Sequence, residues 1–85
     1  MKNIQVIVDH PYQKEGEVLV CYGTWNILKY MEWKTKRSVI LNEKEYREGK
    51  KEHLAIFVRR EEIEKAGYHI EEVPYVFPKE IGTKE

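Results

Sequence analysis

The chain has 85 residues, a length that allows one small domain, and 41% of them are hydrophobic, which is enough for one core and argues against intrinsic disorder. Lys and Arg number 15, as do Asp and Glu, so the zero net charge argues against a histone-like basic binder and an acidic nucleic-acid mimic. The single cysteine, Cys21, excludes an internal disulfide. No apolar run resembles a membrane-spanning helix or an export signal, so the sequence predicts a cytoplasmic protein.

The first third of the chain predicts two strands. Ile4, Val6 and Val8 alternate with other residues as one face of a strand does, and Pro11 follows the end of that strand. Residues 17–22 are apolar on both faces, which predicts a central strand. The two strands are expected to form a hairpin, although their connection is long for one.

Residues 24–35 favour a helix that begins at a Thr24 N-cap, because good helix formers follow and no turn signal intervenes. The apolar side chains nevertheless spread around the whole helical wheel. An extended segment is the alternative, with one face made by Trp25, Ile27, Met31, Trp33 and Thr35.

Residues 38–41 predict a short buried strand. Asn42 is the N-cap of a two-turn helix that Gly49 ends, with a solvated charged hairpin as the alternative. Residues 54–58, Leu-Ala-Ile-Phe-Val, form the clearest strand pattern in the chain.

Residues 60–66 predict a short helix that directs Ile63 and Ala66 inward and ends at Gly67. A further strand begins at residue 68. Its apolar residues change parity at Glu71-Glu72, which predicts a β-bulge or a strand break at that point.

These elements predict an α+β fold with a mostly antiparallel sheet of about five strands and one or two short helices. From residue 17 onward the order is βαββαβ, which is that of a ferredoxin-like fold with an extra N-terminal strand. A mostly-β small barrel with one helix is the alternative, if residues 24–35 are extended. One domain is expected over 1–78, followed by a flexible C-terminal tail over 79–85.

The sequence contains no arrangement typical of an active site, so no enzyme, cofactor or metal is predicted. Cys21 lies in an apolar strand and is expected to be a small buried side chain rather than a nucleophile. The three histidines, at 10, 53 and 69, stand apart and lack metal-ligand spacing. The glycines are isolated, so no phosphate-binding loop is present.

The strongest binding signal is the basic aromatic segment, residues 29–37, in which four basic residues stand against one acidic residue, Glu32. Trp, Tyr and Arg are enriched at protein interfaces, and basic residues with aromatic neighbours also suit nucleic acid. The predicted partner-binding residues are Lys29, Tyr30, Trp33, Lys34, Lys36, Arg37, Arg59 and Arg60.

The resulting hypothesis is a small, non-enzymatic, cytoplasmic binding protein of adaptor or inhibitor type that acts through a protein–protein interface. A nucleic-acid-binding module that uses residues 29–37 is the alternative, although residues 53–58 lack the glycine and aromatic signature of RNA-recognition strands. A small-ligand pocket rimmed by Tyr22, Trp25 and Trp33 at a subunit interface is a third hypothesis. A homodimer formed through a strand edge is also expected to be possible.

Overall fold

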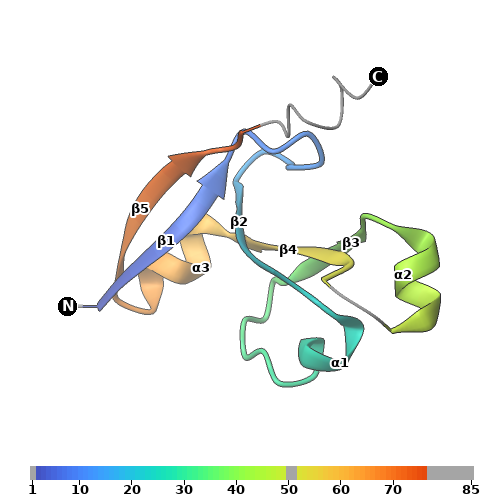
Figure 1. Ribbon diagram of the computed structural model, residues 1–85. Helices are drawn as coiled ribbons and strands as arrows, with labels where there is room; N and C mark the ends of the chain where they lie inside the picture. Colours follow the sequence, from blue (N-terminus) through green and yellow to red (C-terminus); the bar gives the residue numbers. More distant parts are fainter. Residues whose placement is uncertain (1, 50–51, 77–85) are drawn as a thin grey trace.

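Five strands pair into one open sheet in the computed structural model, which describes residues 2–49 and 52–76 (Figure 1). The strands are β1 (Lys2–Val8), β2 (Glu17–Gly23), β3 (Arg37–Ile40), β4 (Leu54–Arg59) and β5 (Tyr68–Pro74). The helices are α1 (Trp25–Leu28), α2 (Glu43–Glu48) and α3 (Arg60–Lys65), so there are three rather than one or two. The sheet order is β3-β4-β2-β1-β5, which confirms a mostly antiparallel α+β sheet; the small-barrel alternative is wrong.

The strand order agrees with the ferredoxin-like expectation in one half of the sheet and departs from it in the other. β4 lies between β2 and β3 and is antiparallel to both, as in a split βαβ unit. β1, however, is inserted between β2 and β5 and pairs in parallel with β5. The extra strand is internal because it has apolar side chains for both faces: Val6 packs on one side and Ile7 on the other. The predicted tail, 79–85, lies outside the described residues.

The irregularity in strand pairing lies in β2, and the β-bulge expected at Glu71-Glu72 is wrong. β5 pairs with β1 in unbroken register along its whole length. The register of β2 with β4 instead shifts between Leu19 and Cys21, where β2 advances two residues and β4 advances one. The parity along β5 changes because its two halves use opposite faces: Ile70 packs towards α3, whereas Val73 remains 40% exposed.

The helix predicted over 24–35 is confirmed for a single turn only. Thr24 is extended and precedes α1, and its side chain makes no capping hydrogen bond. The chain leaves the helix through a turn in which the Tyr30 amide donates to the Ile27 carbonyl, and it then continues irregularly to β3. A longer helix is not favoured because its apolar side chains would point in all directions, so no one face could be buried.

Both ends of α2 are capped as the sequence predicts, so the charged-hairpin alternative is wrong. Asn42 Oδ1 accepts a hydrogen bond from the Glu45 amide at 3.0 Å, and Gly49 ends the helix with a φ of 68°. Tyr46 packs edge-to-face on His53, with 5.3 Å between ring centroids. The buried His53 ring also accepts the first amide hydrogen of α1 at Nε2, so one imidazole connects the two helices.

α3 covers the half of the sheet that contains β1 and β5 (Figure 1). Its one buried side chain, Ile63, packs in a cluster with valines from three strands, Val6, Val18 and Val58. Ala66, which was expected to face inward, is exposed. The helix ends at Lys65, so Ala66 is the C-cap and leads into Gly67, whose φ is 92°. No described helix is long and apolar enough to span a bilayer.

β3 is an edge strand, and the buried strand expected over 38–41 is wrong in that respect. β3 pairs with β4 alone and alternates in burial, with Val39 half-buried and Ile40 exposed. Leu41 lies beyond the end of β3 and is 39% exposed. The strand predicted over 54–58 is confirmed, and all five of its side chains are buried, because β4 is central in the sheet and hydrophobic clusters cover both of its faces.

Side chains from a loop and from β3, rather than a helix, cover Phe57 on the face opposite α3. The guanidinium carbon of Arg37 lies 4.9 Å from the Phe57 ring centroid, and the His10 ring lies 5.5 Å from it. Arg37 Nη2 donates to Glu17 at 2.7 Å and to the Tyr12 carbonyl at 2.9 Å. The hydrogen bond from Arg37 lowers the pKa of the buried Glu17 carboxyl below its ordinary value. Arg37 therefore fastens both the start of β2, through Glu17, and the first loop, through Tyr12, to β3.

We expect Arg37→Leu to lower the free energy of unfolding by about 3 kcal/mol, because Glu17 is then buried without its partner. Glu17→Leu combined with Arg37→Leu removes both charges and should be less damaging than Arg37→Leu alone. Urea unfolding followed by circular dichroism measures both. Because the folded-state pKa of Glu17 is depressed, the stability that its ionised carboxylate contributes is present above the ordinary pKa of 4.5 and is lost as the pH falls through the folded-state pKa. A double variant less stable than Arg37→Leu would contradict this account.

Candidate functional site

The structure divides the basic aromatic segment between separate surfaces. Tyr30 is 76% exposed, and Lys29 Nζ lies 5.6 Å from its ring centroid. Trp33 is half-buried and packs against the α3 cluster. Arg37 lies on the opposite face of the sheet, over Phe57. The segment is therefore not one continuous binding face.

Three of the predicted cationic residues are engaged within the chain. Arg37 is paired with Glu17, and Arg60 is paired with Glu72 of β5. Lys36 Nζ lies 3.5 Å from a backbone carbonyl in its own loop. Because these ammonium and guanidinium groups already have partners, they are less available to a second molecule.

The structure brings Lys34 and Arg59 together at a pocket of about 290 Å³. The rest of its lining is Thr35, Glu61, Glu62 and Lys65. Lys65 Nζ lies 3.3 Å from Glu61, so part of the positive charge at this pocket is neutralised. The pocket has charges of both signs rather than a purely basic surface.

The Glu62 carboxylate of α3 clamps the loop that follows α1. It accepts hydrogen bonds from the Lys34 amide at 2.7 Å, the Thr35 amide at 2.9 Å and the Thr35 hydroxyl at 2.6 Å. The Thr35 oxygen in turn accepts from the Arg59 amide at 3.1 Å. The bond from the Thr35 hydroxyl, followed by those from the two amides, lowers the pKa of Glu62 below its ordinary value. By holding Lys34 and Thr35, Glu62 also positions Trp33, which directly precedes them in the chain.

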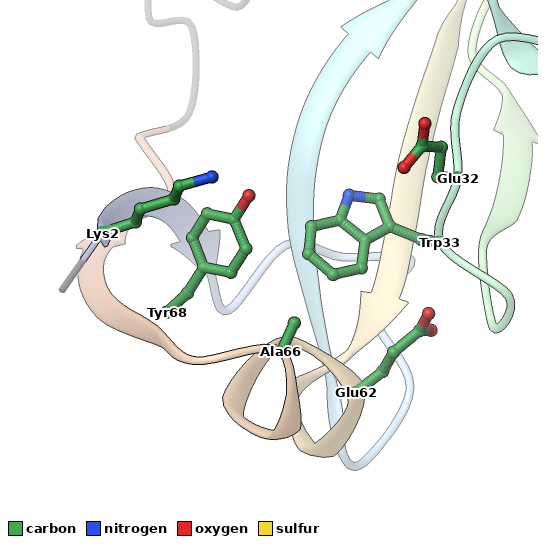
Figure 2. Close-up of a pocket in the computed structure, with 6 residues that line it drawn as sticks. All are labelled: Lys2, Glu32, Trp33, Glu62, Ala66 and Tyr68. Atoms are coloured by element: carbon green, nitrogen blue, oxygen red, sulfur yellow. The ribbon is translucent and has the colours of Figure 1, made fainter.

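Trp33 and Tyr68 form the aromatic wall of a groove of about 520 Å³ beside α3 (Figure 2). Their ring centroids lie 5.6 Å apart in an edge-to-face arrangement. Figure 2 shows Ala66 below and between the two rings, where its small side chain leaves the groove open. The lining is completed by Lys2, Glu32 and Glu62.

Charges of opposite sign stand on the two sides of this groove. Figure 2 shows Lys2 beside Tyr68 and Glu32 beside Trp33. Lys2 Nζ lies 5.8 Å from the Tyr68 ring centroid, which leaves the ammonium group close to the groove. Glu32 is exposed and forms no ion pair with another residue in the described ranges. The groove can therefore accept an apolar side chain whose neighbours carry charge.

Of the residues that line this groove, only Trp33 was among the partner-binding residues predicted from the sequence. Tyr68 was expected to begin a strand, and Ala66 was expected to be buried. Lys2 comes from the first strand, and Glu62 gave no sign beyond a charged helix face. These residues come from distant parts of the chain, and no local spacing relates them to Trp33.

The pocket expected between Tyr22, Trp25 and Trp33 is not formed within one chain. Tyr22 packs with the Leu19 and Phe57 cluster, whereas Trp33 packs with the α3 cluster on the other face. Trp25 is 51% exposed. The sheet itself separates the two aromatic groups.

No group of three His, Cys, Asp or Glu side chains with metal-binding geometry occurs among residues 2–49 and 52–76. Cys21 is half-buried rather than buried, and its burial and the charge of Glu52 raise the pKa of its thiol. His10 is buried, which lowers its pKa, and its Nδ1 accepts the Tyr12 amide hydrogen at 3.1 Å. His53 Nε2 likewise accepts a backbone amide. These groups are arranged for packing and hydrogen bonding within the chain.

Comparison with protein-family models, curated proteins and solved structures finds no match to this chain. A function is therefore inferred from the fold and from the chemistry of its surfaces. The feature with the most definite chemistry is the groove between Trp33 and Tyr68.

Replacing Glu62 by alanine should release the Trp33 loop while leaving Ile63 buried. In a Trp25→Phe background, where Trp33 is the only tryptophan, we expect its emission to shift to longer wavelength as the ring becomes more hydrated. Glu61→Ala is the matched control, because Glu61 lies on the same helix and is ion-paired with Lys65 rather than with the Trp33 loop. An unchanged spectrum in Glu62→Ala would contradict the clamp.

Cys21 should react slowly with a thiol reagent in the native protein, because the thiolate is the reactive form and its formation is disfavoured. Cys21→Ala should lower the free energy of unfolding by about 1 kcal/mol through the small void it creates. Labelling rates in buffer and in urea measure the first effect. Native labelling as fast as that of the unfolded chain would indicate an accessible, activated thiol instead.

Proposed function

We propose that this chain is a small, non-enzymatic protein-binding domain of adaptor or inhibitor type, whose groove between Trp33 and Tyr68 receives a segment of a partner protein. The observation that carries the proposal is an open aromatic groove with the Lys2 ammonium on one side and, on the other, the Glu32 carboxylate, which has no ion-pair partner in the described part of the chain. Aromatic side chains that already have a fixed position lose little conformational entropy when a partner binds. They are also the type of residue that most often dominates interface energy.

The chemistry of the groove suggests the kind of segment that it accepts. An aliphatic or aromatic side chain would lie against Trp33 and Tyr68, above Ala66. A basic neighbour would face Glu32, and an acidic neighbour would face Lys2. Glu62 is not available for this role because its oxygens already accept three hydrogen bonds from the loop.

The non-enzymatic part of the proposal rests on the groups that most often carry catalysis. The thiol of Cys21 has a raised pKa, and the acceptor nitrogens of His10 and His53 are occupied by backbone amides. A general base needs a free acceptor near the substrate. The single cysteine is suited to a reducing compartment such as the cytoplasm.

Nucleic-acid binding is the second candidate, and the observation in its favour is the pocket at which Lys34, Arg59 and Lys65 meet. This pocket shares Glu62 with the aromatic groove, so bases that stack on Trp33 would lie near the cations. The carboxylates of Glu61 and Glu62 at the same pocket oppose a polyanion. A protein partner therefore fits the distribution of charge better.

The test begins with peptides selected from a displayed random library against the wild-type chain. Their binding is then measured by Trp33 fluorescence in the Trp25→Phe background. Ala66→Arg fills the groove without removing any contact, and we expect it to weaken binding about tenfold or more, equivalent to about 1.4 kcal/mol. Gln5→Arg is the control, because it adds the same charge at an exposed position of β1 outside the lining of the groove.

A single-stranded oligonucleotide serves as the competing probe. Binding that falls steeply with salt and is lost in Lys34→Ala/Arg59→Ala, while Ala66→Arg binds normally, would favour the nucleic-acid reading. Peptides that bind Ala66→Arg as tightly as the wild type would place their site outside the groove. Either result contradicts the proposed function.

A further inference from the structure

β3 offers an unprotected strand edge. The sheet order leaves β3 and β5 at its two sides, and β3 pairs only with β4. An edge strand has backbone N–H and C=O groups on its outer side that can pair with another chain. Within β3 there is no proline and no bulge, and its one charged residue, Arg37, is held in an ion pair with Glu17 of the same chain.

The hydrogen bonds identify the backbone groups that face outward. The Leu41 amide donates to the His53 carbonyl at 2.8 Å, immediately after the last residue of β3. Residues along an antiparallel pair alternate between those bonded to the neighbouring strand and those that face away. Val39 and Arg37 are therefore bonded to β4, and the backbone groups of Ser38 and Ile40 point to the open side.

The opposite edge of the sheet is protected. β5 contains Pro74, and it also carries Glu71 and Glu72. The Tyr75 amide donates to the Val8 carbonyl and therefore points towards β1. Because successive backbone groups of a strand point to opposite sides, the nitrogen of Pro74 points to the outer side, where it has no hydrogen to donate. Proline and charge are the usual protection of an edge against pairing. The contrast singles out β3 as the edge open to association.

Exposed apolar side chains gather at the same corner of the molecule. Ile40 is 44% exposed, Leu41 39% and Ile27 38%. Ile27 packs over Gly23, where a Cβ would come within 2.2 Å of the Ile27 Cδ1 atom. Leu54 of β4 is the register partner of both Gly23 in β2 and Ile40 in β3, and the side chains of register partners point to the same face of a sheet. Ile27 and Ile40 therefore lie on the same face, one on each side of β4. A second molecule that extended the sheet at β3 would shield this apolar corner from water.

We propose that two copies of this chain form a homodimer by antiparallel pairing of their β3 strands, with the two-fold axis at Val39. In that register Ser38 of one copy lies opposite Ile40 of the other, and both present their free backbone groups to each other. The pairing continues each five-stranded sheet into the other. The proposed homodimer depends on the β3 edge and is independent of the function proposed for the groove.

Charge favours this orientation and this partner. The basic residues Lys34 and Lys36 precede β3, whereas the helix that follows it, α2, has three glutamates against Lys44 and Arg47 and so a net charge of −1. Antiparallel pairing places the basic end of one strand next to the acidic end of the other, twice in the dimer. Parallel pairing would instead place like charges together. The same complementarity favours a second copy of this chain as the partner.

The test is the mass in solution from sedimentation velocity, over protein concentrations from about 1 µM to about 1 mM. The wild type should move towards twice the monomer mass of 10.3 kDa as its concentration rises. Ile40→Lys places a charge in the interface and should remain a monomer. Val73→Lys is the matched control, since Val73 is 40% exposed on the other edge strand, and this variant should dimerise as the wild type does.

A backbone variant and an amide hydrogen-exchange measurement test the same interface in two further ways. Ser38→Pro removes an N–H that points away from β4, so it should prevent dimerisation while circular dichroism shows an intact fold. Amide hydrogen exchange at Ser38 and Ile40 should slow as the concentration rises, with no such change at Ile70 in β5. A wild type that stays monomeric at the highest concentration overturns the proposal. So does a dimer that survives both Ile40→Lys and Ser38→Pro.

Discussion

The Glu62 carboxylate is the interaction on which the candidate site depends. α3 carries one buried side chain, Ile63, and hydrophobic packing through that residue alone would not fix the position of the loop that follows α1. Glu62 supplies the missing constraint by accepting three hydrogen bonds from Lys34 and Thr35. The loop is thereby held against the helix, and Trp33 is held against Tyr68. A charged residue on a short helix thus determines the shape of an aromatic groove.

The two faces of the sheet are covered in different ways, and this difference decides where a binding site can form. On one face α3 and Trp33 cover a cluster of valines and isoleucine, and they leave a groove at the margin. On the other face the Arg37–Glu17 ion pair and the His10 ring close over Phe57. Arg37 therefore covers Phe57 with its side chain, and the buried Glu17 carboxylate compensates its charge. Because its guanidinium is engaged in this way, Arg37 is not part of the binding surface.

The two surfaces proposed for interaction lie at different places on the sheet and do not compete. The groove is lined by residues of β1, β5 and α3 together with the Trp33 loop, whereas the open edge is β3. A dimer formed through β3 would therefore present two grooves on one assembly. Two linked sites raise the effective concentration for a partner that has two matching segments, without any new contact. A domain of this size also gains stability from association, because a small chain buries a limited share of its own surface.

The sequence by itself determined the local elements whose signals lie within a few residues. It predicted β4 from its continuous apolar run, the α2 caps at Asn42 and Gly49, and the end of α3 at Gly67. It also predicted a mostly antiparallel sheet of about five strands, because the order of strands and helices from residue 17 onward is that of a split βαβ fold.

Only the tertiary structure decided the contacts between residues far apart in the chain. It inserted β1 between β2 and β5, stopped α1 after one turn, and assigned Trp33 to the groove and Arg37 to the opposite face. A pattern of hydrophobicity reports that a side chain is buried or exposed, but not against which distant residue it packs. The groove exists because α3, β5 and a loop meet, and that meeting depends on the strand order, which no local spacing encodes.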